Sequence, residues 1–272
     1  MGANLQAYIL IMRWFANGLF KQILKLYFFV KPCIGLMLYK LYYRSDFKAP
    51  YAIPIIINNR NRLFYLKQQI QSLEERGYTN IFIIDNASTY PPLLEYYTKE
   101  CPYKIYRLDR NLGHLALWQS GLIKYFRKEY FVYTDPDVIP IENCPNDFME
   151  KFLSIMEKYP LLEKVGFSLK IDDLPDTFAK KDTVIDWEKQ FWKKRIAGNP
   201  PLYKAAIDTT FALYKPYYLV GGNLRSPHIR VGEPYQAKHM PWYNDSTHIS
   251  EEELYYIQHC ETFTHWTTGK LK

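Results

Sequence analysis

Four short apolar runs, each followed by polar residues, constrain the fold of this 272-residue chain most strongly. They cover residues 53–57, 81–84, 103–108 and 130–134. Helix-like stretches separate them, at residues 63–76, from Pro91 onward, and at residues 113–128. Apolar runs of strand length that alternate with helical stretches are typical of β-α units and of a parallel sheet. We therefore predict an α/β protein with a mixed, mostly parallel sheet flanked by helices.

Each apolar run turns polar at its carboxyl end. The residues concerned are Asn58, Asn59 and Arg60, then Asp85, Asn86 and Ser88, then Asp109, Arg110 and Asn111, and finally Asp135 and Asp137. One such cluster carries little information, because any strand must leave the core through a polar turn. In an open parallel sheet, however, these ends line one crevice in which ligands bind. Four clusters in succession predict a shared site.

Two carboxylates stand one residue apart directly after the fourth run. Asp135 and Asp137 would repel each other without a cation, and they offer the hard oxygen ligands that Mg²⁺ or Mn²⁺ prefers. A divalent ion there would bridge both phosphates of a nucleoside diphosphate and neutralise the charge on that leaving group. The alternative for an isolated Asp-Pro-Asp is a turn that caps a helix. The surrounding motifs decide between the two interpretations.

In their order, these motifs resemble the nucleotide-binding half of GT-A fold glycosyltransferases, especially family 2-like enzymes. The resemblance covers about residues 51–141 and rests on the runs IPIIINNRNR, FIIDNAST, RNLGHLALWQSGL and YFVYTDPDVIP. It implies a Rossmann-like GT-A domain with a nucleotide-sugar half at residues 49–145 and an acceptor half at residues 146–272. It also implies a UDP- or GDP-sugar as donor and Mn²⁺ or Mg²⁺ as the metal.

The resemblance implies roles for the residues at the first three clusters. Asp85 resembles the acidic residue that binds the nucleobase or ribose, with Asn58 and Arg60 lining the same pocket. Arg110 and Asn111 are expected at the nucleotide, where the helix packed beneath it begins.

For the metal, the resemblance implies three candidates. Asp135 and Asp137 resemble the DxD pair, with Asp137 preferred as the direct ligand and Asp135 also a contact to the nucleotide. His239 resembles the late histidine that closes the metal site or contacts phosphate in several GT-A enzymes. The alternative for a lone histidine is a structural role.

The acceptor half departs from the family 2 pattern, since neither its Glu-Asp pair nor its Q/R-x-x-R-W motif is present as such. An inverting transfer needs a carboxylate to take the acceptor proton, whereas a retaining transfer need not have one. We predict Asp208 and Glu233 as candidates for this catalytic base, with Glu188 behind them.

These candidates have different surroundings. Asp208 is expected to interrupt an apolar strand, AIDTTFALY, a costly position unless the carboxylate is paired or catalytic. The alternative is a carboxylate bonded within its own turn with Thr209 and Thr210. Glu233 stands beside a glycine and a proline in an expected loop, where a solvated acid is the alternative.

Most of the positive charge lies in the N-terminal segment. Residues 1–48 contain seven Lys or Arg and one acid, while the rest of the chain contains 28 basic and 27 acidic residues. A main domain so close to neutral lacks the broad basic field on which nucleic-acid affinity depends, so nucleic acid is excluded as a partner.

The same segment has an amphipathic pattern. Arg13, Asn17, Lys21 and Lys25 recur every four residues within an otherwise apolar stretch, which places them on one stripe of a helix. Because no stretch of about 18 uncharged residues occurs there, we predict a helix lying in a membrane interface rather than one that spans it. Packing on the main domain, or on a second subunit of a homo-oligomer, is the alternative.

The cysteines bear on location. Cys33, Cys101, Cys144 and Cys260 are far apart and form no metal-ligand spacing, which argues against a disulfide framework and favours a reducing environment. We predict a cytoplasmic enzyme on the inner face of a membrane. It would transfer a sugar, with inversion, to a glycan or a lipid-linked acceptor. The alternative is a membrane-associated binding protein that keeps this fold without catalysis.

Overall fold

The computed structural model describes residues 18, 21–23, 26, 30, 33–41, 49–196, 198–208, 210–217 and 228–260. Of the predicted stripe, Arg13, Asn17 and Lys25 lie outside the described residues, as does Thr209, whereas Lys21 is helical and exposed. Residues 33–41 are helical and lie beside helix α5 (Phe148–Lys158). None of the helices in the described part of the chain combines the length and the apolar character that crossing a bilayer requires.

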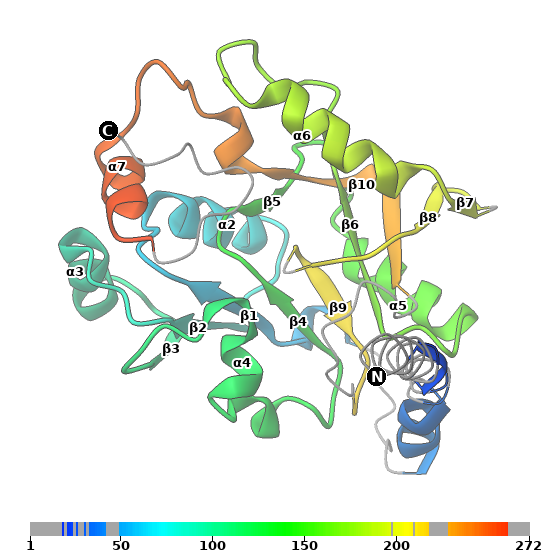
Figure 1. Cartoon of the computed structure of the whole chain (residues 1–272). Helices are drawn as coiled ribbons and strands as arrows, with labels where there is room; N and C mark the ends of the chain where they lie inside the picture. The colour runs from blue at the N-terminus through cyan, green and yellow to red at the C-terminus, as the bar shows by residue number, and fades with distance from the viewer. Residues whose placement is uncertain are drawn as a thin grey trace, which may run out of the picture.

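One mixed sheet runs through the described chain, as predicted. Its strands are β1 (Ile55–Asn59), β2 (Ile81–Asp85), β3 (Lys104–Arg107), β4 (Phe131–Thr134), β5 (Val138–Pro140), β6 (Lys164–Leu169), β7 (Arg195–Ile196), β8 (Leu202–Lys204), β9 (Ala212–Tyr214) and β10 (His228–His239). They follow the order β3-β2-β1-β4-β9-β6-β10-β8-β7, and β5 pairs with β10 (Figure 1). The four strands predicted from the apolar runs are β1 to β4, and they pair in parallel.

The sheet changes character where the second half of the chain joins it. Strand β9 runs antiparallel to both β4 and β6, so it inserts between the two halves. Strand β10 pairs in parallel with β6 along most of its length and antiparallel with β5 and β8 at its two ends. The carboxyl end of β10 is thereby brought back to the residues that follow β4.

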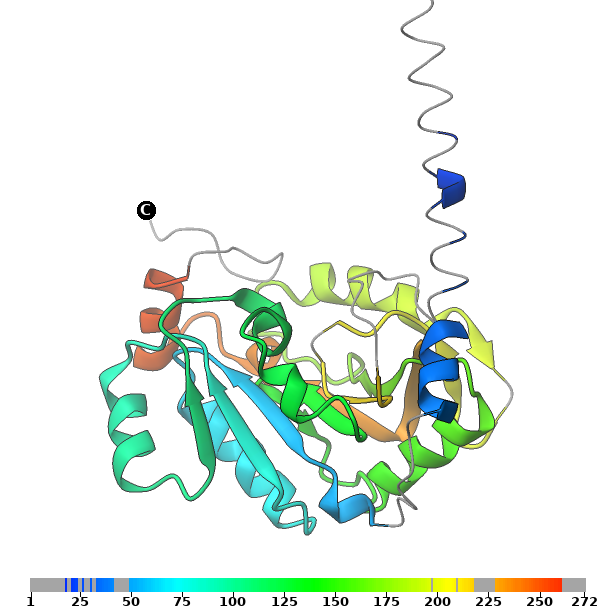
Figure 2. The same ribbon diagram turned by 90° about the horizontal axis from the view of Figure 1, so that it is seen from below.

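Helices cover both faces of the parallel strands (Figures 1 and 2). Ile55 and Ile57 of β1 point into one apolar cluster, which includes side chains of α2 (Phe64–Glu74), α3 (Pro91–Lys99) and α5. Ile56 points into the opposite cluster, with side chains of α4 (Ala116–Gln119). This alternation is the period of two that places successive strand residues on opposite faces of a sheet. The remaining α-helices in the described chain are α6 (Lys181–Glu188) and α7 (Glu251–Gln258).

The single helix predicted at residues 113–128 is wrong. The chain forms the short 3₁₀ turn η2 (Gly113–Leu115), then α4, then a second 3₁₀ turn η3 (Leu122–Tyr125). Gly121 has a φ of 76°, a left-handed conformation that ends a helix and that glycine adopts at little cost. The helical pattern of residues 113–128 therefore continues across a turn at Gly121, and the pattern alone does not reveal that turn.

Two expectations for the acceptor half also need correction. Asp208 does not interrupt a strand, because residues 205–208 lie outside the strands and β9 begins only at Ala212. Glu233 is not in a loop but within β10, at an irregularity where the pairing with β6 shifts register between Val231 and Gln236.

Candidate active site

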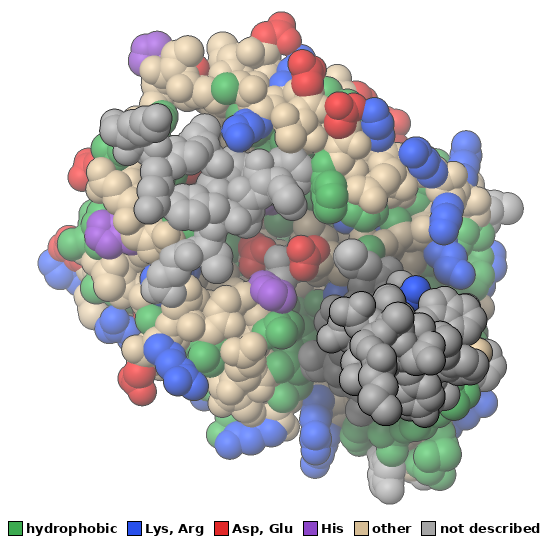
Figure 3. Space-filling model, in the orientation of Figure 1, with side chains coloured by type: hydrophobic (Ala, Val, Ile, Leu, Met, Phe, Trp, Pro, Cys, Tyr) green, Lys and Arg blue, Asp and Glu red, His purple; other side chains and the backbone are tan. Residues whose placement is uncertain are grey.

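The carboxyl ends of β1, β2 and β4 open into one cavity of about 470 Å³. Figure 3 shows acidic and histidine side chains gathered in a hollow on this face of the molecule. The first half of the chain contributes polar lining residues that include Asn58, Arg60, Arg62, Asn86, Asn111, His114, Asp135 and Asp137. The second half contributes polar residues that include Asp208, His239, Asp245, Ser246, His248 and Glu253. Each of the four predicted polar clusters therefore contributes at least one residue to a shared site.

The Asp-Pro-Asp turn is held from below by a buried amide. Gln69 of α2 is fully buried, and its Nε2 donates to the carbonyl oxygens of Asp135, at 2.9 Å, and of Val138, at 2.8 Å. The Thr134 hydroxyl donates to the Asp135 carbonyl as well, at 2.9 Å. Strand β5 follows Asp137 directly, so the alternative of a helix cap is wrong. The two carboxylates are thus presented at the cavity by a rigid turn between two strands.

Sheet pairing brings His239 to this turn. The antiparallel register of β5 and β10 sets His239 opposite Val138, and the Met240 amide donates to the Asp137 carbonyl at 2.8 Å. As a result, His239 Nε2 lies 3.7 Å from Asp137 Oδ1. Burial lowers the pKa of His239, although the Asp137 carboxylate opposes this effect. The imidazole is therefore neutral near pH 7, which is its metal-binding form.

The chemistry of this pair suits a divalent cation. Asp137 Oδ1 and His239 Nδ1 are both buried, and neither makes a hydrogen bond within the described chain. A buried carboxylate oxygen left without a donor is costly, and a cation would remove that cost. No group of three His, Cys, Asp or Glu side chains in the described residues could hold a metal by itself. Of the three predicted ligands, the structure thus brings Asp137 and His239 together, but it does not arrange all three around one point.

Elsewhere in the cavity lining, two asparagines fix the loop at residues 111–113. Asn86 accepts from the Leu112 amide at 2.7 Å and donates to the Gly113 carbonyl at 3.0 Å. Asn58 donates to the same carbonyl at 3.3 Å. Gly113 has a φ of 63°, and its amide donates to the Asn111 side chain at 2.9 Å. Asn58 and Asn111 thus line the cavity as predicted, and Asn86 joins them.

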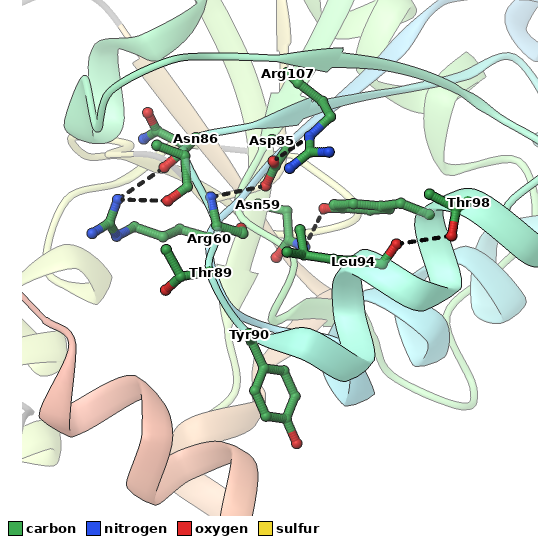
Figure 4. A network of polar contacts seen from close by, with 12 residues as sticks. Asn59, Arg60, Asp85, Asn86, Thr89, Tyr90, Leu94, Thr98 and Arg107 are labelled. Atoms are coloured by element: carbon green, nitrogen blue, oxygen red, sulfur yellow. Dashed lines mark hydrogen bonds and ion pairs between the residues drawn. The ribbon is translucent and has the colours of Figure 1, made fainter.

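Asp85 does not line the cavity. Its side chain is 1% exposed and lies in the polar network of Figure 4, where Oδ1 accepts from the Ser88 amide at 3.2 Å and Oδ2 faces Arg107 Nε at 3.4 Å. Its carboxylate thus stabilises the turn after β2. Arg60 does line the cavity, and its guanidinium donates to the carbonyls of Asn86 and Ala87. Arg110 is exposed and lies outside the lining.

An ion pair that the sequence did not suggest closes one wall. Arg62 and Glu253 of α7 pair at 2.5 and 3.2 Å, and the guanidinium lies 3.6 Å from the centre of the Tyr256 ring. Burial works against the charge of Arg62, but Glu253, Tyr256 and Asp137 together outweigh it and raise the pKa of Arg62. Glu252 accepts from the Leu63 and Phe64 amides, at 2.8 and 2.9 Å, and so caps α2.

Sequence comparison identifies the family. The family described as glycosyl transferase family 2 matches residues 55–219, which is more than half of the chain. The chain belongs to glycosyl transferase family 2. No curated protein matches it. The parallel strands β3-β2-β1-β4, joined through antiparallel β9 to a second half, are the GT-A fold that the resemblance implied.

Solved structures similar to this family 2 chain include TarS 1-349 of S. aureus in complex with UDP-GlcNAc, at 12% identity and a TM-score of 0.42. This likeness covers 76% of the chain and 64% of TarS. Glucosyl-3-phosphoglycerate synthase from Mycobacterium tuberculosis is similar at 13% identity and a TM-score of 0.37, over 63% of the chain and 62% of that protein. GalNAc-T7 with UDP, GalNAc and Mn²⁺ is similar at 13% identity and a TM-score of 0.43, over 68% of the chain and 45% of that protein. The chain thus spans less than two thirds of each of these structures.

The three carboxylates predicted as catalytic bases for a family 2 protein lie in different places. Asp208 is exposed and lines the cavity together with Asp135 and Asp137. Glu233 lies on β10 outside the cavity lining. Glu188 is buried, 4% exposed, in an ion pair with Arg230 at 2.9 Å, so it is not available to an acceptor. Of the three, the cavity contains only Asp208.

Proposed function

We propose that this family 2 protein transfers a sugar from a nucleoside-diphosphate sugar to an acceptor hydroxyl. The observation that carries the proposal is the cavity at the carboxyl ends of β1, β2 and β4, which combines the Asp135–Asp137 turn with His239 and Asp208. A UDP- or GDP-sugar is the donor class, because the cavity offers carboxylates for a metal-bound diphosphate and amide side chains for a nucleoside.

Within this proposal, Asp135, Asp137 and His239 hold Mn²⁺ or Mg²⁺. When bound, such an ion neutralises negative charge on a diphosphate leaving group. The nucleoside would face the part of the same cavity that is lined by the amide side chains of Asn58, Asn86 and Asn111. Arg60 and Arg62 add positive charge to the cavity lining.

Asp208 is proposed as the general base of an inverting transfer. Its carboxylate takes the proton from the acceptor hydroxyl while that oxygen forms a bond to the anomeric carbon. The bond from this carbon to the diphosphate oxygen breaks, and the diphosphate keeps the electron pair. The support for Asp208 is its exposed carboxylate in the same cavity as the Asp-Pro-Asp turn.

Donor hydrolysis tests this function without knowledge of the acceptor. The purified full chain with Mn²⁺ and a panel of UDP- and GDP-sugars should release nucleoside diphosphate slowly, with water as acceptor. Asp137→Asn should lower this rate by about a thousandfold or more, since the carboxylate nearest to His239 is lost. Its melting temperature should remain close to that of the wild type. Release that persists in Asp137→Asn would refute the metal assignment, and no release from any donor by the wild type would favour the inactive binding protein.

We also propose that the N-terminal segment brings the cavity to a membrane surface, where a lipid-linked acceptor would lie. In the helix at residues 33–41, Ile34, Met37 and Leu41 are 41%, 53% and 51% exposed. Tyr39, by contrast, packs against the main domain and meets Tyr130. An apolar outer face with flanking cations suits a lipid interface. Flotation of the full chain and of a chain starting at Phe47 with anionic vesicles tests this, and equal recovery of both would refute it.

A further inference from the structure

Residues 205–208, which carry Asp208, lie outside the strands of the sheet, and buried side chains hold them in place. Lys164 Nζ donates to the carbonyl oxygens of Ile207, at 2.8 Å, and of Asp208, at 3.5 Å. Arg230 Nε donates to the Ala206 carbonyl at 2.7 Å. Side chains from β6 and β10 thus donate to the carbonyl groups of residues 206–208, which have no strand partner because this segment lies outside the sheet.

A third side chain holds the same segment from the amide side. His228 Nδ1 accepts from the Ile207 amide at 3.2 Å. His228 of β10 pairs in register with Lys164 of β6, and Arg230 follows two residues later. Because strand side chains alternate between faces, His228 and Arg230 share one face of β10. The three groups therefore form one cluster beneath residues 206–208.

The burial of this cluster is costly in itself. Lys164, His228 and Arg230 are 7%, 3% and 3% exposed, and polar or charged side chains are seldom buried to this degree unless they are paired or functional. Glu188 neutralises Arg230, at 2.9 Å with both side chains 4% exposed. An apolar cluster would fill the same space at lower cost but would leave the carbonyls of residues 206–208 without donors. The buried cluster therefore fixes the main chain of residues 206–208 at a cost in stability.

We propose that Lys164, His228 and Arg230 are positioning residues that fix the main chain of residues 206–208 and thereby hold the Asp208 carboxylate in the cavity. The inference rests on the proposed function, in which Asp208 is the base. The donor-binding turn is held separately, by Gln69 beneath Asp135 and Val138. Loss of a positioning residue should therefore reduce the rate of the chemical step and leave donor binding intact.

The test compares two buried lysines in the full chain. Lys164→Met removes the donor to residues 207 and 208, whereas Lys215→Met removes a lysine that is 6% exposed and donates to the Pro160 carbonyl away from the cavity. For Lys164→Met, we expect the kcat of donor hydrolysis to fall by about tenfold to a hundredfold, because a misplaced catalytic group is costly. The KM for the donor and the Kd for UDP or GDP with Mn²⁺ should stay within about twofold. Lys164→Arg should recover most of the rate, and Lys215→Met should keep it.

Hydrogen-deuterium exchange provides a second measurement that needs no activity. In Lys164→Met, amides of residues 205–208 should exchange faster, while those of residues 135–140 should not change. The inference is overturned if exchange at residues 205–208 is unaffected, if KM rises as much as kcat falls, or if Lys215→Met loses the same rate. A wild-type chain that hydrolyses no donor would refute the proposed function, and the exchange experiment would still decide whether Lys164 holds this segment.

Discussion

The two halves of the candidate site are held by different means. On the donor side, polar residues at the ends of β1, β2 and β4 meet because neighbouring parallel strands end at the same edge, and amides such as Gln69 and Asn86 fix the turns between them. On the acceptor side, Asp208 lies on a coil segment held by buried cationic side chains. Sheet topology is enough to assemble the first half, whereas the second depends on individual buried contacts.

The largest effect we expect from the acceptor side is that of Asp208→Asn. Removing a general base lowers the rate of the chemical step by about 10² to 10⁴-fold, so kcat for sugar transfer or donor hydrolysis should fall by that factor. The donor KM should change little, because the Asp-Pro-Asp turn remains in place. Steady-state release of nucleoside diphosphate measures both quantities.

Glu233→Gln is the matched control for Asp208→Asn. The sequence offers both residues as candidates, yet Glu233 lies on β10 outside the cavity, and its substitution should leave kcat within about twofold. If Glu233→Gln lowers kcat as much as Asp208→Asn does, or if Asp208→Asn keeps the wild-type kcat, then Asp208 is not the base.

The same division explains which parts of the molecule the sequence can predict. The apolar runs at β1 to β4 and the polar residues after them are sufficient to place Asn58, Asn111, Asp135 and Asp137 at one cavity, because the period of the pattern is local. The nearness of His239 to Asp137 is implied by the family resemblance alone. Its physical cause, the register of β5 with β10, joins residues about a hundred positions apart and has no local signal.

Contacts that the local sequence pattern does not reveal account for the errors and omissions. Arg62 pairs with a glutamate 191 residues later, and nothing in the NRNR run distinguishes it from Arg60. Glu188 is a candidate base in the sequence because no local pattern shows that its carboxylate pairs with Arg230. Family position assigns Asp85 to the nucleotide, but Arg107 and the Ser88 amide occupy its carboxylate. In each case a distant or tertiary partner decides the role.

A second prediction concerns the cost of the Glu188–Arg230 pair. Burial raises the pKa of Glu188 and lowers that of Arg230, so for both groups the loss of hydration outweighs their mutual attraction. Glu188→Leu alone leaves a buried guanidinium without its counter-charge and should destabilise the chain by about 3–5 kcal/mol. Glu188→Leu combined with Arg230→Met should recover most of that loss. Urea unfolding measures the free energies of unfolding.

In the double variant, stability and activity should separate. It lacks the donor to the Ala206 carbonyl, so we expect kcat for donor hydrolysis to stay well below that of the wild type even where stability is restored. A double variant as active as the wild type would mean that Arg230 serves stability alone. One that is less stable than Glu188→Leu would mean that the ion pair itself stabilises the fold.

The smallest effect is expected at Lys215, the buried lysine away from the cavity. Burial lowers the pKa of Lys215 from 10.5 to about 8, although Glu163 opposes this effect. Between these two values the unfolded chain binds a proton that the folded chain does not, so this contribution to stability rises with pH. The cost of burying the charge is therefore fully present below about pH 8 and is lost by about pH 10.5. Relative to Lys215→Met, the free energy of unfolding of the wild type should rise by roughly 1–3 kcal/mol between pH 7 and pH 10. Urea unfolding at several pH values measures it, and a difference between the two proteins that stays constant across this range would contradict the prediction.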